Sequence, residues 1–142
     1  MNVANLSSSL RTAVSTLNKR LRKQDYSSEN YSITEIETMG YLHRKGNLSP
    51  SELAGLTKIR PQSMSSILDK FEEQKLIKRI PSKEDKRKIH VALTTSGKKI
   101  VEKTRYERDG WLTKNIDKTL TDKEKKTLKK AIEILNRLAE AE

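Results

Sequence analysis

Basic side chains gather in one short segment of the sequence, residues 78–88. Six positive charges fall within these eleven residues, against the two carboxylates of Glu84 and Asp85. The six are Lys78, Arg79, Lys83, Lys86, Arg87 and Lys88. Phosphates are suitable partners for such a cluster, and an Arg on a protruding tip can enter a narrow minor groove, where the potential is most negative. Taken alone, the segment is equally compatible with a solvated, charged turn.

A second polar set lies just upstream, between residues 60 and 70. Apolar side chains recur there at i, i+3, i+4 and i+7, which is the spacing of one helix face. They are Met64, Ile67, Leu68 and Phe71. The other face carries Gln62, Ser65, Ser66, Asp69 and Lys70, with Arg60 and Ser63 close by. Gln can contact adenine and Arg guanine in a bidentate way, but an ordinary amphipathic helix with a solvated face is the alternative.

Helix-start signals precede and follow these two sets. Three times, Ser or Thr is followed three residues later by Glu, so that the hydroxyl can cap a backbone N–H and the Glu can reach back to the cap residue. The pairs are Ser32 with Glu35, Ser49 with Glu52, and Thr121 with Glu124. Pro50 stands at a first helical position, where its missing N–H costs nothing. We therefore expect helices over about 33–45 and 50–57, and another that Thr121 opens.

The segment from 49 to 93 has the order of a winged helix-turn-helix. A further helix is predicted from Pro61 to about Lys75, followed by two strands over 76–81 and 88–93. In the second strand Ile89, Val91 and Leu93 alternate with Lys88, His90 and Ala92, a period of two. The charged residues 82–87 between the strands predict an exposed hairpin loop. In such proteins the second helix of the motif enters the major groove.

Composition and charge exclude several classes of protein. The 142 residues carry a formal charge of +11, which favours an anionic partner. There is no Cys, so disulfides and thiolate chemistry are excluded and a reducing cytoplasm is the expected location. No apolar run is long enough to span a membrane, and His43 and His90 lack metal-ligand spacing. We find no catalytic constellation, and expect neither an enzyme nor a cofactor.

The order and spacing of these pieces resemble the multiple antibiotic resistance regulator (MarR) family over essentially the whole chain. The matching pieces are Gly46–Ala54, Ile67–Arg79, Asp85–Arg87 and Leu93–Gly97. The resemblance implies a homodimeric winged-helix transcription factor, usually a repressor released by a small molecule, that reads pseudo-palindromic operators. It also implies that Arg87 enters the minor groove and that Asp85 orients it. Lys86 stands where the family usually has Arg, and Gln74-Lys75 replaces a frequent x-Gly.

The predicted fold class is mainly α (α+β), a single MarR-like domain over residues 1–142. Residues 32–94 form the winged helix-turn-helix lobe, and residues 1–30 and 96–142 form dimerisation helices. Apolar stripes at residues 6–21, 111–120 and 128–138 have no lobe core left to cover, so two chains packing together would bury them. Intrachain packing is the alternative. Within the helix predicted at 96–118, capped by Thr94 or Thr95, Gly110 is a weak point or a bend.

The predicted partners are duplex DNA, a second copy of the chain and a small aromatic or anionic effector. The DNA-binding residues are Arg60, Gln62, Ser63, Ser65, Ser66, Lys70, Lys83, Asp85, Lys86, Arg87 and Lys88. An effector pocket of the kind the family has would involve Tyr31, Met39, His43, Tyr106 and Trp111, although filling of core or interface explains these residues as well. Two other functions stay open, a winged-helix module for protein contact and a non-specific DNA-binding protein.

Overall fold

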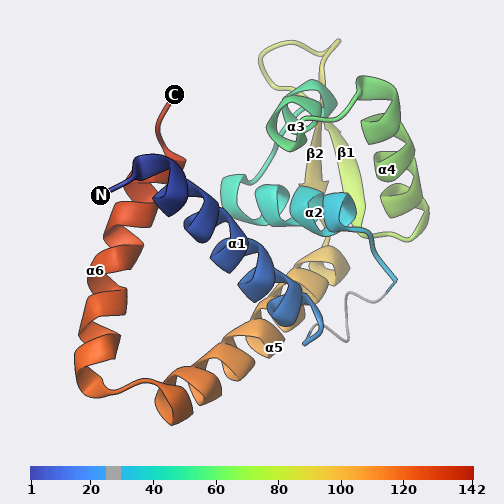
Figure 1. Ribbon diagram of the computed structural model, residues 1–142. Helices are drawn as coiled ribbons and strands as arrows, with labels where there is room; N and C mark the ends of the chain where they lie inside the picture. The colour runs from blue at the N-terminus through green and yellow to red at the C-terminus, as the bar shows by residue number, and fades with distance from the viewer. Residues whose placement is uncertain (25–29) are drawn as a thin grey trace. The chain divides into compact units, whose positions relative to one another are not determined.

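The computed structural model describes residues 1–24 and 30–142, in which six helices and two strands follow one another (Figure 1). They are α1 (Val3–Arg22), α2 (Ile33–Lys45), α3 (Pro50–Thr57), α4 (Pro61–Glu73), β1 (Ile77–Pro81), β2 (Ile89–Leu93), α5 (Thr95–Thr119) and α6 (Asp122–Ala139). Contacts divide them into two compact units. We call residues 30–106 the central unit, and residues 1–24 with 107–142 the terminal unit. The mainly helical, winged fold class is confirmed.

The three predicted capping boxes are all formed, and they fix where α2, α3 and α6 begin. At α2, the Ser32 hydroxyl accepts from the Glu35 backbone N–H at 3.1 Å, and the Ser32 N–H donates to Glu35 Oε1 at 2.8 Å. Thr94, rather than Thr95, caps α5, because its hydroxyl accepts from the Gly97 N–H at 3.2 Å. The predicted bounds 33–45 and 50–57 are those observed.

The core of the central unit is built from the predicted apolar stripe of α4 and its neighbours. Met64, Leu68 and Phe71 are 0% exposed, and they meet Met39 of α2 and Leu53 of α3, which are also 0% exposed. Burying a side chain of this size contributes roughly 1.5–3 kcal/mol. The core therefore holds α4 by one face and leaves its polar face outward.

The hairpin pairs β1 antiparallel to β2, from Ile77 opposite Leu93 to Pro81 opposite Ile89. Leu48 adds a third backbone pairing, because its N–H and C=O both bond to Val91, at 3.1 and 2.7 Å. The predicted strict alternation is wrong at two positions: Ile89 is 45% exposed, whereas Ala92 is buried with its neighbours. Ile89 belongs to the last pair before the loop, and α2 and α3 both pack against β2 (Figure 1).

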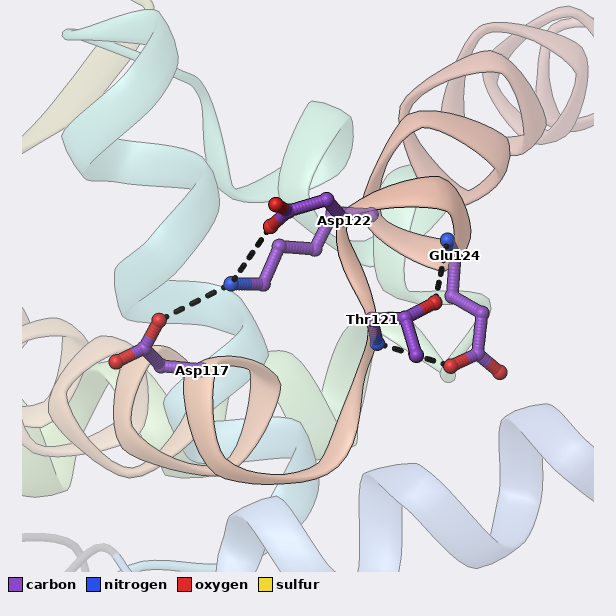
Figure 2. A network of polar contacts seen from close by, with 5 residues as sticks. Asp117, Thr121, Asp122 and Glu124 are labelled. Atoms are coloured by element: carbon purple, nitrogen blue, oxygen red, sulfur yellow. Dashed lines mark hydrogen bonds and ion pairs between the residues drawn. The ribbon is translucent and has the colours of Figure 1, made fainter.

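The terminal unit contains α1, the part of α5 from residue 107 onward, and α6. The first helix begins at Val3, ahead of the apolar stripe predicted from Leu6, because Asn2 Oδ1 accepts from the Asn5 N–H at 3.2 Å. The fifth helix continues through Gly110 without a break. At its end, Lys125 pairs with Asp117 at 3.0 Å and with Asp122 at 3.9 Å, beside the capping box of Thr121 and Glu124 (Figure 2). Across the described residues, no helix has the length and apolar character to cross a membrane.

Candidate nucleic-acid interface

The first turns of α4 present the predicted polar residues to solvent. Arg60, Gln62, Ser63, Ser65 and Ser66 are all exposed. Arg60 is the cap residue of α4, and this helix has no side-chain cap hydrogen bond, unlike α1, α2, α3 and α6. The backbone N–H groups of the first turn are therefore not satisfied by a capping side chain, and they carry the positive end of the helix dipole.

Further along α4, Asp69, Lys70 and Glu72 are paired within the chain. Arg79 of β1 donates to Asp69 Oδ1 at 2.8 Å and lies 3.4 Å from Glu72 Oε2. Two carboxylates on α4 thereby share one guanidinium, which ties the helix to the first strand of the hairpin. The sequence interpretation counted Arg79 only as part of the basic cluster. The signal it missed is the spacing of Asp69 and Glu72, which lie on one helix face.

The predicted Lys70 contact lies in a different environment from the rest of the polar face. Its Nζ lies 2.7 Å from Glu35 Oε2, and the Glu35 side chain is only 9% exposed. Burial raises the pKa of Glu35, but hydrogen bonds from Lys70 and the Ser32 N–H outweigh this effect, so the pKa lies below its ordinary value. The other predicted residues of α4 face solvent, whereas Lys70 forms an ion pair with Glu35.

The loop between β1 and β2, residues 82–88, extends from the end of the hairpin (Figure 1). Asp85 shapes it, because Oδ1 accepts from the Arg87 backbone N–H at 3.0 Å and from Arg87 Nε at 3.3 Å. The Lys88 N–H donates to the Asp85 carbonyl at 2.9 Å. The Arg87 side chain is nevertheless 91% exposed. Lys83, Lys86 and Lys88 are also exposed, so the tip is basic on its surface and ordered by one carboxylate.

One basic residue near the interface was not among the predicted contacts. Lys58 lies in the turn between α3 and α4 with φ 58° and ψ 40°, and it is exposed two residues before Arg60. A left-handed backbone is uncommon for a residue other than Gly, Asn or Asp. Residue type gave no indication of this conformation, and only the tight turn between two predicted helices could have drawn attention to the position.

The five predicted effector residues have separate environments. Met39 fills the core, and Tyr31 packs at its edge with its ring 6.2 Å from that of Phe71. His43 Nδ1 lies 3.4 Å from Arg105, and its Nε2 lies 3.7 Å from Glu102. Tyr106 is 80% exposed. Trp111 belongs to the terminal unit, where the Arg20 guanidinium lies 5.3 Å from its ring. Core packing accounts for Met39 and Tyr31, and the effector pocket stays a prediction.

Among residues 1–24 and 30–142, no group of three or more His, Asp or Glu side chains is arranged to hold a metal ion. The candidate interface is a surface of exposed polar and basic groups on α4 and the hairpin loop.

Known proteins similar to this chain share its fold. A model of the MarR family matches residues 30–88. An HTH-type transcriptional regulator of Mycobacterium bovis is 29% identical over 132 residues, which are 93% of this chain and 91% of that protein. A transcriptional regulator from Pseudomonas aeruginosa has a TM-score of 0.84 at 27% identity, with 98% of this chain and 96% of that chain covered. A MepR variant from S. aureus, bound to an oligodeoxyribonucleotide, has a TM-score of 0.65 at 25% identity, with 94% and 97% covered.

Proposed function

We propose that the chain, which a model of the MarR family matches over residues 30–88, regulates transcription as a homodimer bound to a pseudo-palindromic DNA operator. The family is one of regulators and not of enzymes. The MepR relative bound to an oligodeoxyribonucleotide supports DNA as the partner. In this proposal α4 is the recognition helix, and the hairpin with its basic loop is the wing.

The observation that carries the proposal is the geometry of the wing tip. Arg87 is 91% exposed, yet its backbone and its Nε are both held by Asp85. An exposed Arg that is already oriented loses less conformational freedom when it enters a minor groove. The narrow groove concentrates negative potential where such an Arg would sit. Lys83, Lys86 and Lys88 then contact phosphates on either side.

The recognition helix supplies the major-groove contacts in this proposal. Arg60 and Gln62 can read guanine and adenine edges, and Ser63, Ser65 and Ser66 allow close approach and bond to bases or phosphates. All five are exposed at the start of the helix. The uncapped first turn adds backbone N–H donors that favour a phosphate. Lys58, in the turn just before, is a further phosphate contact in this proposal.

The terminal unit provides the proposed dimer interface. Its apolar stripes are open to solvent in the single chain: Leu6, Val14 and Leu17 of α1 are 47–54% exposed, and Ile132 and Leu138 of α6 are 47% and 58% exposed. Monomeric proteins rarely expose large contiguous apolar patches, so exposed stripes of this kind favour a covering partner. A two-fold dimer would bury both stripes and place two recognition helices about one turn of DNA apart. The proposed place of action is the cytoplasm, with a small aromatic or anionic effector releasing the operator.

Selection of DNA fragments tests the proposal. The purified protein is mixed with random genomic fragments at about 150 mM salt, and the retained fragments are sequenced. The proposal expects a shared pseudo-palindrome with half-sites roughly ten base pairs apart. Retention without a shared sequence would indicate a non-specific DNA-binding protein. A protein that retains no DNA, before and after refolding away any ligand, would indicate a protein-interaction module.

Replacing the wing arginine sharpens the test. Arg87→Ala should weaken binding to the selected fragment by about 1 kcal/mol or more, with the dimer intact. Arg11→Ala, which removes the same charge from an exposed position of α1, is the matched control and should change affinity much less. Equal affinity of Arg87→Ala and the unaltered chain in a titration would refute the assignment of the wing.

A further inference from the structure

The ammonium group of Lys70 occupies a built environment beside the start of α2. Its Nζ lies 2.7 Å from Glu35 Oε2 and 5.4 Å from the centre of the Tyr31 ring. The next residue, Phe71, is 0% exposed and meets the same Tyr31 ring edge-on at 6.2 Å and 67°. Two consecutive residues of α4 therefore contact one short segment, residues 31–35, at the start of α2.

Glu35 holds two elements at once. Its Oε1 accepts from the Ser32 N–H at 2.8 Å, which closes the capping box of α2, and its Oε2 accepts from Lys70. The residue is 6% exposed. A carboxylate with so little contact to water keeps its charge only if protein groups satisfy its oxygens. Releasing Lys70 to a phosphate would leave Oε2 without this partner, so the pair resists exchange with DNA.

The position of Lys70 along the helix connects this pair to the proposed interface. Ser66 precedes Lys70 by four residues and Gln62 precedes it by eight, so the three lie along one side of α4. Ser66 and Gln62 are exposed, whereas Lys70 is 40% exposed and engaged. Rotation of α4 about its axis would move all three together. A contact that fixes Lys70 therefore fixes the direction in which Gln62 and Ser66 face the bases.

We propose that Glu35 and Lys70 are positioning residues, which set the rotation of the recognition helix and thereby sequence discrimination, and that Lys70 does not bind phosphate. This inference rests on the proposed DNA-binding function. It replaces the phosphate contact that the sequence suggested for Lys70 with an intrachain role. A charge pair with geometric requirements suits this task, because it adds a directional constraint to the apolar packing that already holds α4.

The experiment compares Glu35→Gln, Lys70→Gln, the double variant and Lys70→Arg. Gln at position 35 can still complete the capping box, so the change is confined to the ion pair. Glu124→Gln is the matched control, because Glu124 occupies the same third position of a capping box and has an exposed side chain. Dissociation constants are measured for a selected genomic fragment and for the same fragment with scrambled half-sites, at several salt concentrations. Thermal melts of each variant report folding.

The positioning role predicts a specific pattern. Each single Gln variant binds the selected fragment about tenfold more weakly, the double variant is no worse than either single one, and Lys70→Arg restores most of the affinity. Binding to the scrambled fragment and the slope of affinity against salt stay the same. Glu124→Gln binds as the unaltered chain does. If Glu35→Gln fails to fold, the two Lys70 variants carry the test, since Lys70 is partly exposed.

A phosphate-binding Lys70 predicts the opposite pattern. Lys70→Gln would then weaken both fragments alike and reduce the steepness of the salt dependence by about one, while Glu35→Gln would leave affinity unchanged or raise it. That result overturns the inference and leaves the proposed function standing. Equal affinities for all variants overturn it as well. An unaltered chain that retains no fragment at any salt concentration refutes the proposed function itself, and the inference with it.

Discussion

The central and terminal units use similar helices in different ways. Every buried residue of the described chain lies between Glu35 and Thr104, within the central unit. In the terminal unit, α1 and α6 have no buried residue, although both carry clear apolar stripes. The central unit thus completes its own core, whereas the terminal unit presents apolar surface that a single chain does not cover. We infer that the first is stable through its own packing and the second through association.

The difference shows what a helical stripe can and cannot indicate. The spacing of Met64, Leu68 and Phe71 is of the same kind as that of Leu10, Val14 and Leu17. Phe71 is 0% exposed and Leu17 is 47% exposed. Periodicity identifies the face of a helix that avoids water. The spacing of the apolar residues does not identify the partner that covers this face. The following changes separate the two units, beginning with the largest expected effect.

The core of the central unit should be the most sensitive to truncation. Phe71→Ala removes a fully buried ring and should lower the free energy of unfolding by about 3–5 kcal/mol. Because the loss is within one chain, it should appear in denaturant titrations at every protein concentration. Tyr106→Ala, at a position that is 80% exposed in the same unit, is the control and should cost much less. A small decrease in the free energy of unfolding for Phe71→Ala would mean that the central unit does not form a well-packed core on its own.

A charge on the α6 stripe should break the assembly instead of the fold. Ile132→Asp should raise the dissociation constant of the dimer by about a hundredfold or more. In a two-fold interface the substitution is present on both chains, so the loss of roughly 1.5–3 kcal/mol from burying the side chain occurs twice. Analytical ultracentrifugation over a range of concentrations measures this shift. Lys126→Asp, on another face of α6, should leave the dimer in place. Identical sedimentation of Ile132→Asp and the unaltered chain would place the interface elsewhere.

Acid should weaken the central unit through Glu35. Its folded pKa is lowered, so the stability it contributes is present at neutral pH and is lost as the pH falls through that lowered pKa, below the ordinary glutamate value of about 4.3. The hydrogen bonds from Lys70 and Ser32 are the groups involved. Melting curves between neutral and acidic pH should show a smaller pH dependence for Glu35→Gln. Parallel pH profiles for the variant and the unaltered chain would contradict this account.

The smallest expected effect is a gain in stability at the turn after α4. Lys75 has φ 61°, a left-handed conformation that costs a residue with a Cβ about 1 kcal/mol. Lys75→Gly should therefore raise the free energy of unfolding by about 0.5–1 kcal/mol. Gln74→Gly, one position earlier where φ is −80°, should lower it. Thermal melts distinguish the two, and a loss of stability in both variants would mean that the Lys75 side chain contributes more than its backbone strain costs.

Much of the central unit could be predicted because its signals are local. Capping boxes at Ser32 and Ser49, and the charged loop between two strands, each depend on a few neighbouring residues. The pairing of Glu35 with Lys70 could not be predicted, since it joins elements whose packing angle the sequence does not give. For Arg79, the spacing of Asp69 and Glu72 indicated a charged helix face but not its partner. Ile89 was misplaced for a similar reason, because burial along β2 depends on the helices that pack against the strand and not on the strand period alone. The partner of the terminal stripes has no local signal.

The central claim is that a self-contained DNA-reading unit works in pairs held together by the terminal unit. The most direct measurement is the mass and footprint of the complex formed on a selected genomic fragment. The account predicts two chains per fragment and two protected half-sites roughly ten base pairs apart, with both lost together in Ile132→Asp. A single chain bound to a single half-site with the same affinity and specificity would contradict it.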